Sequence, residues 1–296
     1  MSDHLVGNNS KNPDRNQLQQ QDAFCAAIVS VTATSDKAKN IEQAFAAARE
    51  AVHEGASWIV LPEMFAFHGP YSDLWQNAEF SDGPLNQRLA AFANEHKVIL
   101  FAGSVAERPE GSTAGKVYNS QFVFDRTGQL LAKYRKTHLF NLKDSNGQSL
   151  YCESDGYLSG AELVSFQVDG WTVGLATCYD LRFPGVFERL AKNGPLDCLV
   201  IPAAFTFQTG AYHWELLLRA RAVEQLCYVV APNQVGVHSP GKQSFGHGLI
   251  VDPWGTTIAD TGHLPGMAMA TIKKDRIIAC RSQLPVLENR RPELYR

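Results

Sequence analysis

From Ala23 onward the chain alternates short apolar runs with amphipathic helical patterns, and this alternation restricts the fold more than any other feature. The first run, AFCAAIVSVTA, precedes a pattern at 37–55 in which Ile41 and Phe45 lie on one helical face. The run SWIVLPE at 57–63 follows directly. Strands that are apolar along their whole length are typical of sheets that are covered on both faces. The alternation therefore predicts an α/β fold.

The rest of the chain continues this alternation and adds hairpins. Turn residues at 125–128 and 169–170 separate pairs of apolar runs, which predicts two antiparallel hairpins. Periodicity also predicts helices at 84–97, 183–194 and 211–225, and strands at 98–107, 197–204, 227–232, 246–253, 256–262 and 267–273. No linker or repeat interrupts these elements, so we expect one domain over 22–296. Before it, the Asn- and Gln-rich segment 1–21 is expected to be a disordered polar tail.

Composition and charge exclude several kinds of partner. The 296-residue chain has a formal net charge of −3, and its 27 Lys and Arg residues are scattered, so we expect no nucleic-acid binding. No apolar run approaches the roughly 18 residues that span a bilayer, and the N-terminal segment lacks the apolar core of a signal peptide. The six cysteines lie far apart without a CxxC pair, which is typical of reduced thiols. We therefore expect a cytoplasmic protein that contacts no membrane and holds no metal.

Three residues with complementary chemistry follow three of the predicted strands. Glu63 ends the run through 58–61, Lys136 ends the run through 130–134, and Cys178 follows 173–177. Strand ends and the loops after them build the sites of α/β sheets, so these side chains are candidates to converge. A carboxylate can take the proton of a thiol nucleophile, and an ammonium can stabilise the oxyanion that forms. Together they suffice for acyl transfer without a cofactor. The alternative is that the three residues have no catalytic role, because strand-end thiols are usually inert and single Glu and Lys side chains are usually solvated.

The segments around these residues resemble a known family. Leu61-Pro62-Glu63, the run YRKTHLF at 134–140 and the run CYDLRFP at 178–184 are similar, in this order, to the three signature motifs of the nitrilase (carbon–nitrogen hydrolase) superfamily. The similarity extends from Ala23 to about Ile272. It implies a four-layer α-β-β-α sandwich and the pairing of two subunits whose sandwiches stack, in a homodimer or a higher homo-oligomer.

The resemblance also implies catalytic roles. It makes Glu63 the general base, Lys136 the oxyanion stabiliser and Cys178 the nucleophile, and we expect the backbone N–H of Tyr179 to hold the oxyanion as well. Glu153 falls where many members carry a second carboxylate that orients the site. The alternative for Glu153 is an ordinary loop carboxylate.

The motifs favour one branch of the superfamily. True nitrilases place Trp-Glu after the nucleophile, whereas this chain has Tyr179-Asp180 and resembles the Nit-type amidases. That resemblance implies hydrolysis of a small amide that carries a carboxylate, with deaminated glutathione as the leading substrate, through a thioester. The alternatives are an ω-amidase on α-ketoglutaramate, a carbamoyl- or nitrile-cleaving relative, and a scaffold protein with an unused triad. The insert-like loop at 141–154 departs from the shorter loops of the family.

Four further residues are candidates for substrate binding. Arg182 lies four residues after the predicted nucleophile, and its planar guanidinium can bind a substrate carboxylate through two N–H groups. The simpler alternative is a salt bridge to Glu188 or Asp180. Phe205, Thr206 and His213 are expected to shape the pocket wall. For Phe205 and His213 the alternatives are core packing and a dimer contact.

Overall fold

The computed structural model describes residues 22–294, so the predicted tail at 1–21 lies outside the described residues. Two sheets form its centre. The first has the order β17-β1-β2-β3-β4-β5, with β8 beside β4, and the second has the order β16-β15-β12-β11-β10-β9. In the first sheet β1, β2 and β3 run parallel, and in the second β10, β11 and β12 do so. The remaining neighbours are antiparallel, except that β8 runs parallel to β4.

The elements have the following bounds. The strands of the first sheet are β1 (Ala23–Ser30), β2 (Trp58–Val60), β3 (Ile99–Glu107), β4 (Val117–Phe124), β5 (Leu130–Arg135), β8 (Tyr157–Leu158) and β17 (Gly266–Lys273). Those of the second are β9 (Val164–Val168), β10 (Trp171–Leu175), β11 (Cys198–Val200), β12 (Tyr228–Ala231), β15 (Leu249–Val251) and β16 (Thr257–Asp260). The helices are α1 (Lys37–His53), α2 (Leu74–Asn77), α3 (Pro84–His96), α4 (Pro184–Leu190), α5 (Phe207–Gln225) and α6 (Lys274–Gln283).

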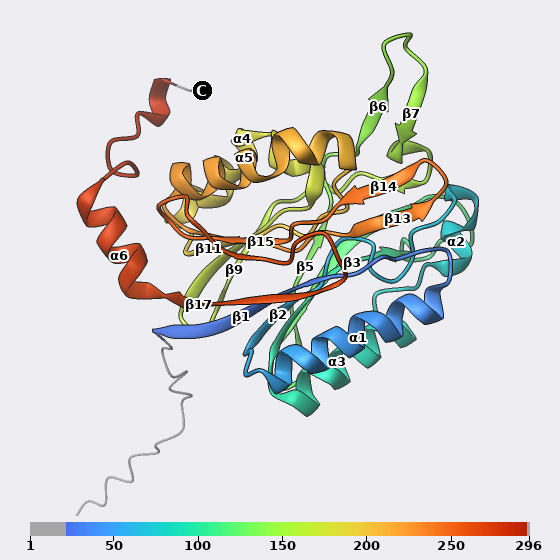
Figure 1. The fold of residues 1–296 in the computed structure, drawn as a ribbon, viewed down its shortest axis with the longest axis horizontal. Helices are drawn as coiled ribbons and strands as arrows, with labels where there is room; N and C mark the ends of the chain where they lie inside the picture. Colours follow the sequence, from blue (N-terminus) through green and yellow to red (C-terminus); the bar gives the residue numbers. More distant parts are fainter. Residues whose placement is uncertain (1–21, 295–296) are drawn as a thin grey trace, which may run out of the picture.

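Alternate side chains of the central strands face different layers. In β1, Ala27 and Val29 pack in the cluster that joins the first sheet to α1 and α3, whereas Ala26 and Ile28 pack against the second sheet. In β12, Val229 packs in the cluster beneath α4 and α5. Figure 1 shows the resulting order, with α1 and α3 on one side, two sheets in the middle and α4 and α5 on the other side. The predicted α-β-β-α sandwich is confirmed.

Local signals explain where several elements begin and turn. The Asp36 side chain accepts a hydrogen bond from the Lys39 N–H (3.1 Å) and so caps the start of α1. The predicted turn between β9 and β10 has positive φ at both Asp169 (52°) and Gly170 (80°), as a two-residue hairpin requires. No helix within 22–294 is long and apolar enough to cross a membrane.

Several elements were not predicted from the sequence, among them the short helix α2 and the short strand β8. The predicted loop at 141–154 contains the hairpin β6 (Asn141–Lys143) and β7 (Ser149–Cys152), and a second hairpin, β13 (Val235–Ser239) and β14 (Lys242–Phe245), precedes β15. Both hairpins are too short and too polar to show an apolar alternation. Helix α6 follows β17 and was also not predicted, because few of its residues are buried and no apolar stripe marks it.

Candidate active site

Cys178 follows strand β10 at a sharp turn. Its backbone has a φ of 46°, a left-handed conformation that costs a non-glycine residue on the order of 1–3 kcal/mol. The Cys178 N–H donates to the carbonyl of Pro202 (3.0 Å), which follows the neighbouring strand β11. The side chain is 8% exposed and lines a cavity at this edge of the sheet. The strained turn therefore holds the thiol at one defined place.

Glu63 follows strand β2 of the other sheet and is almost fully buried. Its Oε2 accepts a hydrogen bond from the N–H of Ala204 (2.7 Å), which comes after β11, so this bond joins the edges of the two sheets. The segment that carries Glu63 lies close to β3. A Cβ atom at Gly103 would stand 2.0 Å from the carbonyl oxygen of Leu61, so this approach requires glycine.

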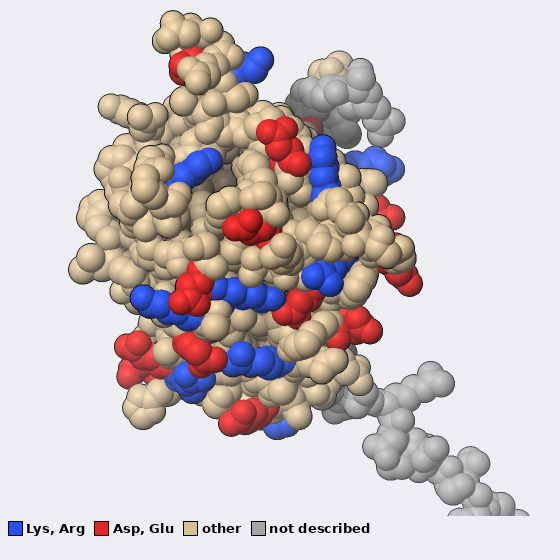
Figure 2. Space-filling view, turned by 90° about the vertical axis from the view of Figure 1, so that its right-hand side faces the viewer, with Lys and Arg blue, Asp and Glu red and all other residues tan. Residues whose placement is uncertain are grey.

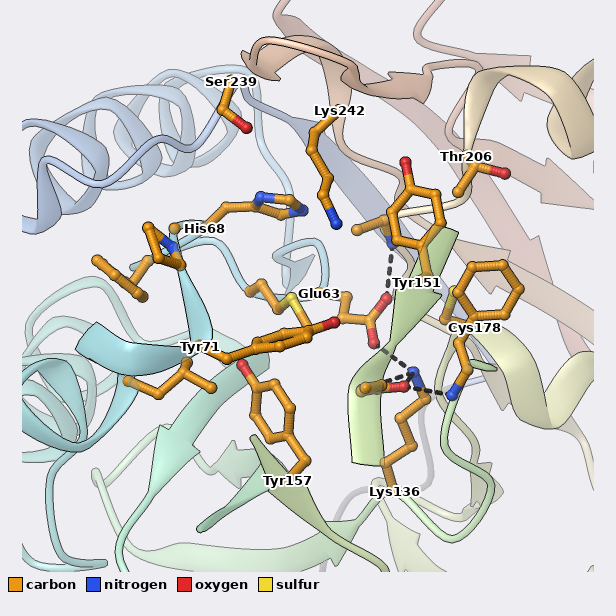
Figure 3. A pocket seen from close by; sticks show the side chains of 18 residues that line it. Glu63, His68, Tyr71, Lys136, Tyr151, Tyr157, Cys178, Thr206, Ser239 and Lys242 are labelled. Carbon is orange, nitrogen blue, oxygen red and sulfur yellow. Dashed lines mark hydrogen bonds and ion pairs between the residues drawn. The ribbon is translucent and has the colours of Figure 1, made fainter. Parts of the chain in front are cut away.

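Lys136 follows strand β5 and is 2% exposed. Its Nζ donates to Glu63 Oε1 (2.9 Å) and to both oxygens of Glu153 (2.8 and 3.0 Å). Figure 3 shows these contacts as dashed lines at one side of the cavity. Two carboxylates against one ammonium leave a formal charge of −1 when all three groups are ionised. As the sequence analysis predicted, Glu63, Lys136 and Cys178 lie together and line one cavity.

Glu153 is buried beside Lys136 and not solvated on a loop. It is 3% exposed, and the N–H of Phe140 donates to its Oε2 (2.6 Å). The ordinary loop-carboxylate interpretation is therefore wrong, since this side chain is fixed by a buried ammonium and a backbone donor.

Asn119 joins the two carboxylates, and the sequence analysis missed it. Its Nδ2 donates to Glu63 Oε1 (2.8 Å) and to Glu153 Oε1 (3.1 Å). The available signal was the polar run at 119–121 in the middle of the otherwise apolar strand β4. A buried polar group in a strand needs a partner, and here the partners are the carboxylates of Glu63 and Glu153.

Burial and charge act together on the ionisable groups of the cluster. Burial opposes the charge of Lys136, but Glu153 and Glu63 outweigh it and raise the pKa of Lys136 well above its usual value. Burial raises the pKa of Glu153, against the effect of Lys136. Burial, helped by Glu63, also raises the pKa of the Cys178 thiol well above its usual value. A thiol with a raised pKa is protonated at neutral pH, so a nucleophilic role for Cys178 would require a base beside it.

The cavity above Cys178 has a volume of about 410 Å³, within the roughly 300–1,000 Å³ typical of small-molecule sites. Figure 2 shows the face of the molecule that is hollowed there, below the protruding hairpin. In Figure 3, Lys242 enters the cavity from the side opposite Lys136, and Tyr71 and Tyr157 lie along one wall. Aromatic and apolar side chains thus surround a few polar groups.

A second, much smaller hollow adjoins Cys178 and contains three of the predicted substrate-binding residues. Arg182, Phe205 and Thr206 line it, together with Cys178 and Tyr179. Thr206 lines the large cavity as well. The Arg182 guanidinium lies 5.1 Å from the centroid of the Phe205 ring, which is 3% exposed.

The contacts of Arg182 differ from the salt bridge that the sequence analysis considered as its simpler role. Within 22–294 it forms no ion pair, so the salt bridge to Glu188 or Asp180 is absent. Its Nη1 lies 3.3 Å from Nδ1 of His213, which is exposed on α5. Contrary to the sequence prediction, His213 lines neither the large cavity nor the small hollow, because its exposed ring contacts Arg182 on the outer side of the hollow. No three His, Cys, Asp or Glu side chains among the described residues gather as a metal site would require.

The comparison with known proteins decides the family. The model of the carbon–nitrogen hydrolase family matches residues 25–282. The chain belongs to the carbon–nitrogen hydrolase family. As a member of this family it is a hydrolase of carbon–nitrogen bonds, and its relatives include several amidases.

Three of these relatives are similar over nearly the whole chain. The chain is 37% identical over 269 residues to a deaminated glutathione amidase of Synechocystis, covering 90% of this chain and 98% of that protein. It is 39% identical over 273 residues to the human deaminated glutathione amidase, covering 91% and 83%. It is 35% identical over 274 residues to the mouse omega-amidase NIT2, covering 92% and 96%. Together they place this carbon–nitrogen hydrolase among the amidases.

Solved structures support the fold. The NitFhit protein of C. elegans is 32% identical with a TM-score of 0.84, over 93% of this chain and 66% of that chain. Nit3 of Saccharomyces cerevisiae, a member of the nitrilase superfamily, is 27% identical with a TM-score of 0.82, over 94% and 100%. The resemblance stated from the motifs is therefore confirmed.

Proposed function

We propose that this carbon–nitrogen hydrolase cleaves deaminated glutathione to α-ketoglutarate and cysteinylglycine, through a thioester on Cys178. One observation carries the mechanism: the Glu63 carboxylate bridges the Lys136 ammonium and the Ala204 N–H in the same cavity as the Cys178 thiol. The substrate is supported by the deaminated glutathione amidases among the relatives, including those of Synechocystis and human.

The first half of the reaction forms the thioester. Glu63 takes the proton of the Cys178 thiol as the sulfur attacks the amide carbonyl carbon, because the raised thiol pKa leaves little free thiolate. Lys136 and the backbone N–H of Tyr179 hold the oxyanion. When the intermediate collapses, Glu63 gives its proton to the amide nitrogen, the C–N bond breaks and the amine leaves.

The second half hydrolyses the thioester. Glu63 takes a proton from water as the water oxygen attacks the thioester carbonyl, and the same two donors hold the new oxyanion. The C–S bond then breaks, Glu63 returns the proton to the sulfur, and the free acid leaves. Glu153 and Asn119 keep Glu63 and Lys136 in position throughout, since each is hydrogen-bonded to the cluster.

Arg182 binds the carboxylate of the acyl half in this proposal. It lines the small hollow beside Cys178 and has no anionic partner among the described residues. Phe205 and Thr206 shape the hollow, and His213 supports Arg182 from its outer side.

An ω-amidase reaction on α-ketoglutaramate is the second candidate, favoured by the similarity to mouse omega-amidase NIT2. That substrate has the same acyl half and differs in its amine half, which is ammonia. The two reactions therefore use the same chemistry and are separated only by substrate.

The experiment measures product release from four compounds by wild type and by Cys178→Ala. The compounds are deaminated glutathione, α-ketoglutaramate, an aliphatic nitrile and an N-carbamoyl amino acid. We expect Cys178-dependent release of cysteinylglycine, with deaminated glutathione giving the highest kcat/KM. Preference for another compound would overturn the substrate, and activity of Cys178→Ala would overturn the mechanism.

We also propose a homodimer in the cytoplasm. Helix α5 buries Trp214 and Leu218 against the second sheet, yet its outer face leaves Tyr212 78% and Leu216 66% exposed. Large apolar side chains exposed on one helix face are typical of a surface that another subunit covers. The cytoplasmic location is supported by six cysteines that are all free thiols.

A further inference from the structure

We propose that Lys242 binds a carboxylate carried by the amine half of the substrate, and that it thereby selects amides of carboxylate-bearing amines over primary amides. This inference rests on the proposed function. Lys242 lies on the hairpin β13–β14, outside all of the motifs that identified the site. It lines the large cavity, and Figure 3 shows its ammonium directed into it.

The ammonium of Lys242 has no anionic partner among the residues that the structure describes. Within 22–294 it forms neither an ion pair nor a hydrogen bond, and its contacts are the rings of Tyr151 (4.0 Å to the centroid) and Tyr71 (6.0 Å). Lys136, the other lysine that lines the cavity, is ion-paired with both Glu63 and Glu153. Of the two lysines that line this cavity in the described part of the chain, Lys242 is therefore the one without a carboxylate partner.

The environment of Lys242 favours an anion as that ligand. Burial lowers the pKa of Lys242, so the charged form lacks the solvation or counter-charge that it would find in water. A bound carboxylate supplies this counter-charge and gains a charge-assisted hydrogen bond. Aromatic rings on two sides limit the positions that the ammonium can take, which reduces the entropy lost on binding.

The hairpin that carries Lys242 is firmly anchored. The buried ring of His238 contacts the carbonyl of Ala33 through Nδ1 (2.7 Å) and the hydroxyl of Ser244 through Nε2 (2.8 Å). The N–H of Phe245 donates to the carbonyl of Phe205 (2.9 Å), next to the catalytic edge. Lys242 is thus presented to the cavity by a rigid element.

The position of Glu63 indicates that Lys242 contacts the amine half of the substrate rather than the acyl half. Glu63 gives its proton to the leaving nitrogen, and it lines the large cavity but not the small hollow of Arg182. The amine half must therefore leave through the large cavity, where Lys242 lies. A carboxylate on that half is also repelled by the negative cluster around Lys136, so it is best placed at the opposite side, where Figure 3 shows Lys242.

The test compares substrates that differ only in the amine half. Deaminated glutathione carries a glycine carboxylate there, its C-terminal carboxamide analogue carries none, and α-ketoglutaramate carries only ammonia. Kinetic constants for the three are measured with wild type, Lys242→Met and Lys242→Arg. Lys143→Met, an exposed lysine on the neighbouring hairpin, is the matched control.

We expect Lys242→Met to lower kcat/KM for deaminated glutathione by about 10- to 100-fold, mostly through KM, because a charge-assisted contact is lost. The carboxamide analogue should lose a similar factor with wild type, and Lys242→Met should add little to that loss. Lys242→Arg should restore most of the activity. Hydrolysis of α-ketoglutaramate, and every activity of Lys143→Met, should remain within about twofold.

Two results would overturn the inference, and they differ from failure of the proposed function. If Lys242→Met leaves deaminated glutathione unchanged, or if it weakens all three substrates equally, Lys242 does not recognise the amine half. If wild type does not cleave deaminated glutathione at all, the proposed function fails, and this assignment fails with it.

Discussion

The carboxylate of Asp180 accepts hydrogen bonds from the backbone N–H (3.0 Å) and the ring Nδ1 (2.8 Å) of His138. Asp180 lies two residues after Cys178, and His138 lies two residues after Lys136. The same carboxylate also accepts from the Thr177 N–H (2.8 Å) and the Tyr134 hydroxyl (2.6 Å). One buried side chain therefore ties the turn that carries the thiol to the loop that carries the ammonium.

Asp180→Asn is expected to damage both stability and catalysis. An amide presents one oxygen and two donors where the carboxylate accepts from several donors, so at least one buried donor loses its partner. We expect a loss of about 1–3 kcal/mol in the free energy of unfolding, measured by urea denaturation. We expect kcat to fall by up to about 10²-fold, since Cys178 and Lys136 lose their common anchor. Asp82→Asn, at an exposed position, is the control, and equal effects of both variants would contradict this account.

Asn119→Asp tests the bridge between the two carboxylates. The substitution keeps the shape of the side chain but places a third carboxyl group beside Glu63 and Glu153. Since like charges disfavour ionisation, protonation of the cluster should begin at higher pH. We expect the acidic limb of the kcat/KM profile to move upward by roughly one pH unit or more. If the acidic limb of the Asn119→Asp profile has the same midpoint pH as that of wild type, Asn119 does not influence the ionisation of the cluster.

Glu107 provides a pH dependence of stability that is independent of catalysis. Burial would raise its pKa, but hydrogen bonds from Arg135, Ser120, Ser81 and Lys133 outweigh burial and lower the pKa to about 2. The folded-state pKa lies below the ordinary value of 4.5, so this stabilisation is complete above about pH 5 and is lost as the pH falls toward 2.

Glu107→Gln should therefore lower the Tm at pH 7 and make the Tm decline less steeply between pH 5 and pH 3. Thermal unfolding followed by circular dichroism over this range measures the effect. The exposed Glu110→Gln should behave as wild type. If Glu107→Gln instead shows the wild-type slope, the acid sensitivity lies in other groups.

The exposed face of α5 predicts the oligomeric state. We expect wild type to have the mass of a dimer in light scattering, and Leu216→Glu to be a folded monomer, because a charge is placed in the proposed interface. Leu264→Glu changes an equally exposed leucine (74%) outside α5 and should remain dimeric. A monomeric wild type, or a dimeric Leu216→Glu variant, would contradict the proposed interface.

The sequence was most informative where a local pattern determines the structure. Apolar runs bounded by turn residues located the strands of both sheets, and Glu63, Lys136 and Cys178 follow strands directly. The strands β2 and β10 belong to different sheets, so recognising them placed Glu63 and Cys178 at strand ends but did not bring the two together. The packing of one sheet on the other does so, and the bond from the Ala204 N–H to Glu63 joins their edges.

Other parts of the site depend on contacts between distant segments. The hairpin that presents Lys242 is held by a contact between His238 and Ala33, which lie more than two hundred residues apart. No local pattern encodes such a contact. The hairpin β6–β7 did have a turn signal, Asn146-Gly147, but its strands are mostly exposed and lack the apolar alternation that identifies a strand.

The central claim is an acyl-enzyme on Cys178, and hydroxylamine tests it most directly. Hydroxylamine competes with water for a thioester, so turnover of deaminated glutathione in its presence is measured with wild type and with Cys178→Ala. We predict that wild type forms α-ketoglutaryl hydroxamate beside α-ketoglutarate, in a proportion that rises with hydroxylamine, and that Cys178→Ala forms neither. Release of cysteinylglycine by wild type without any hydroxamate, or by Cys178→Ala at all, would contradict the account.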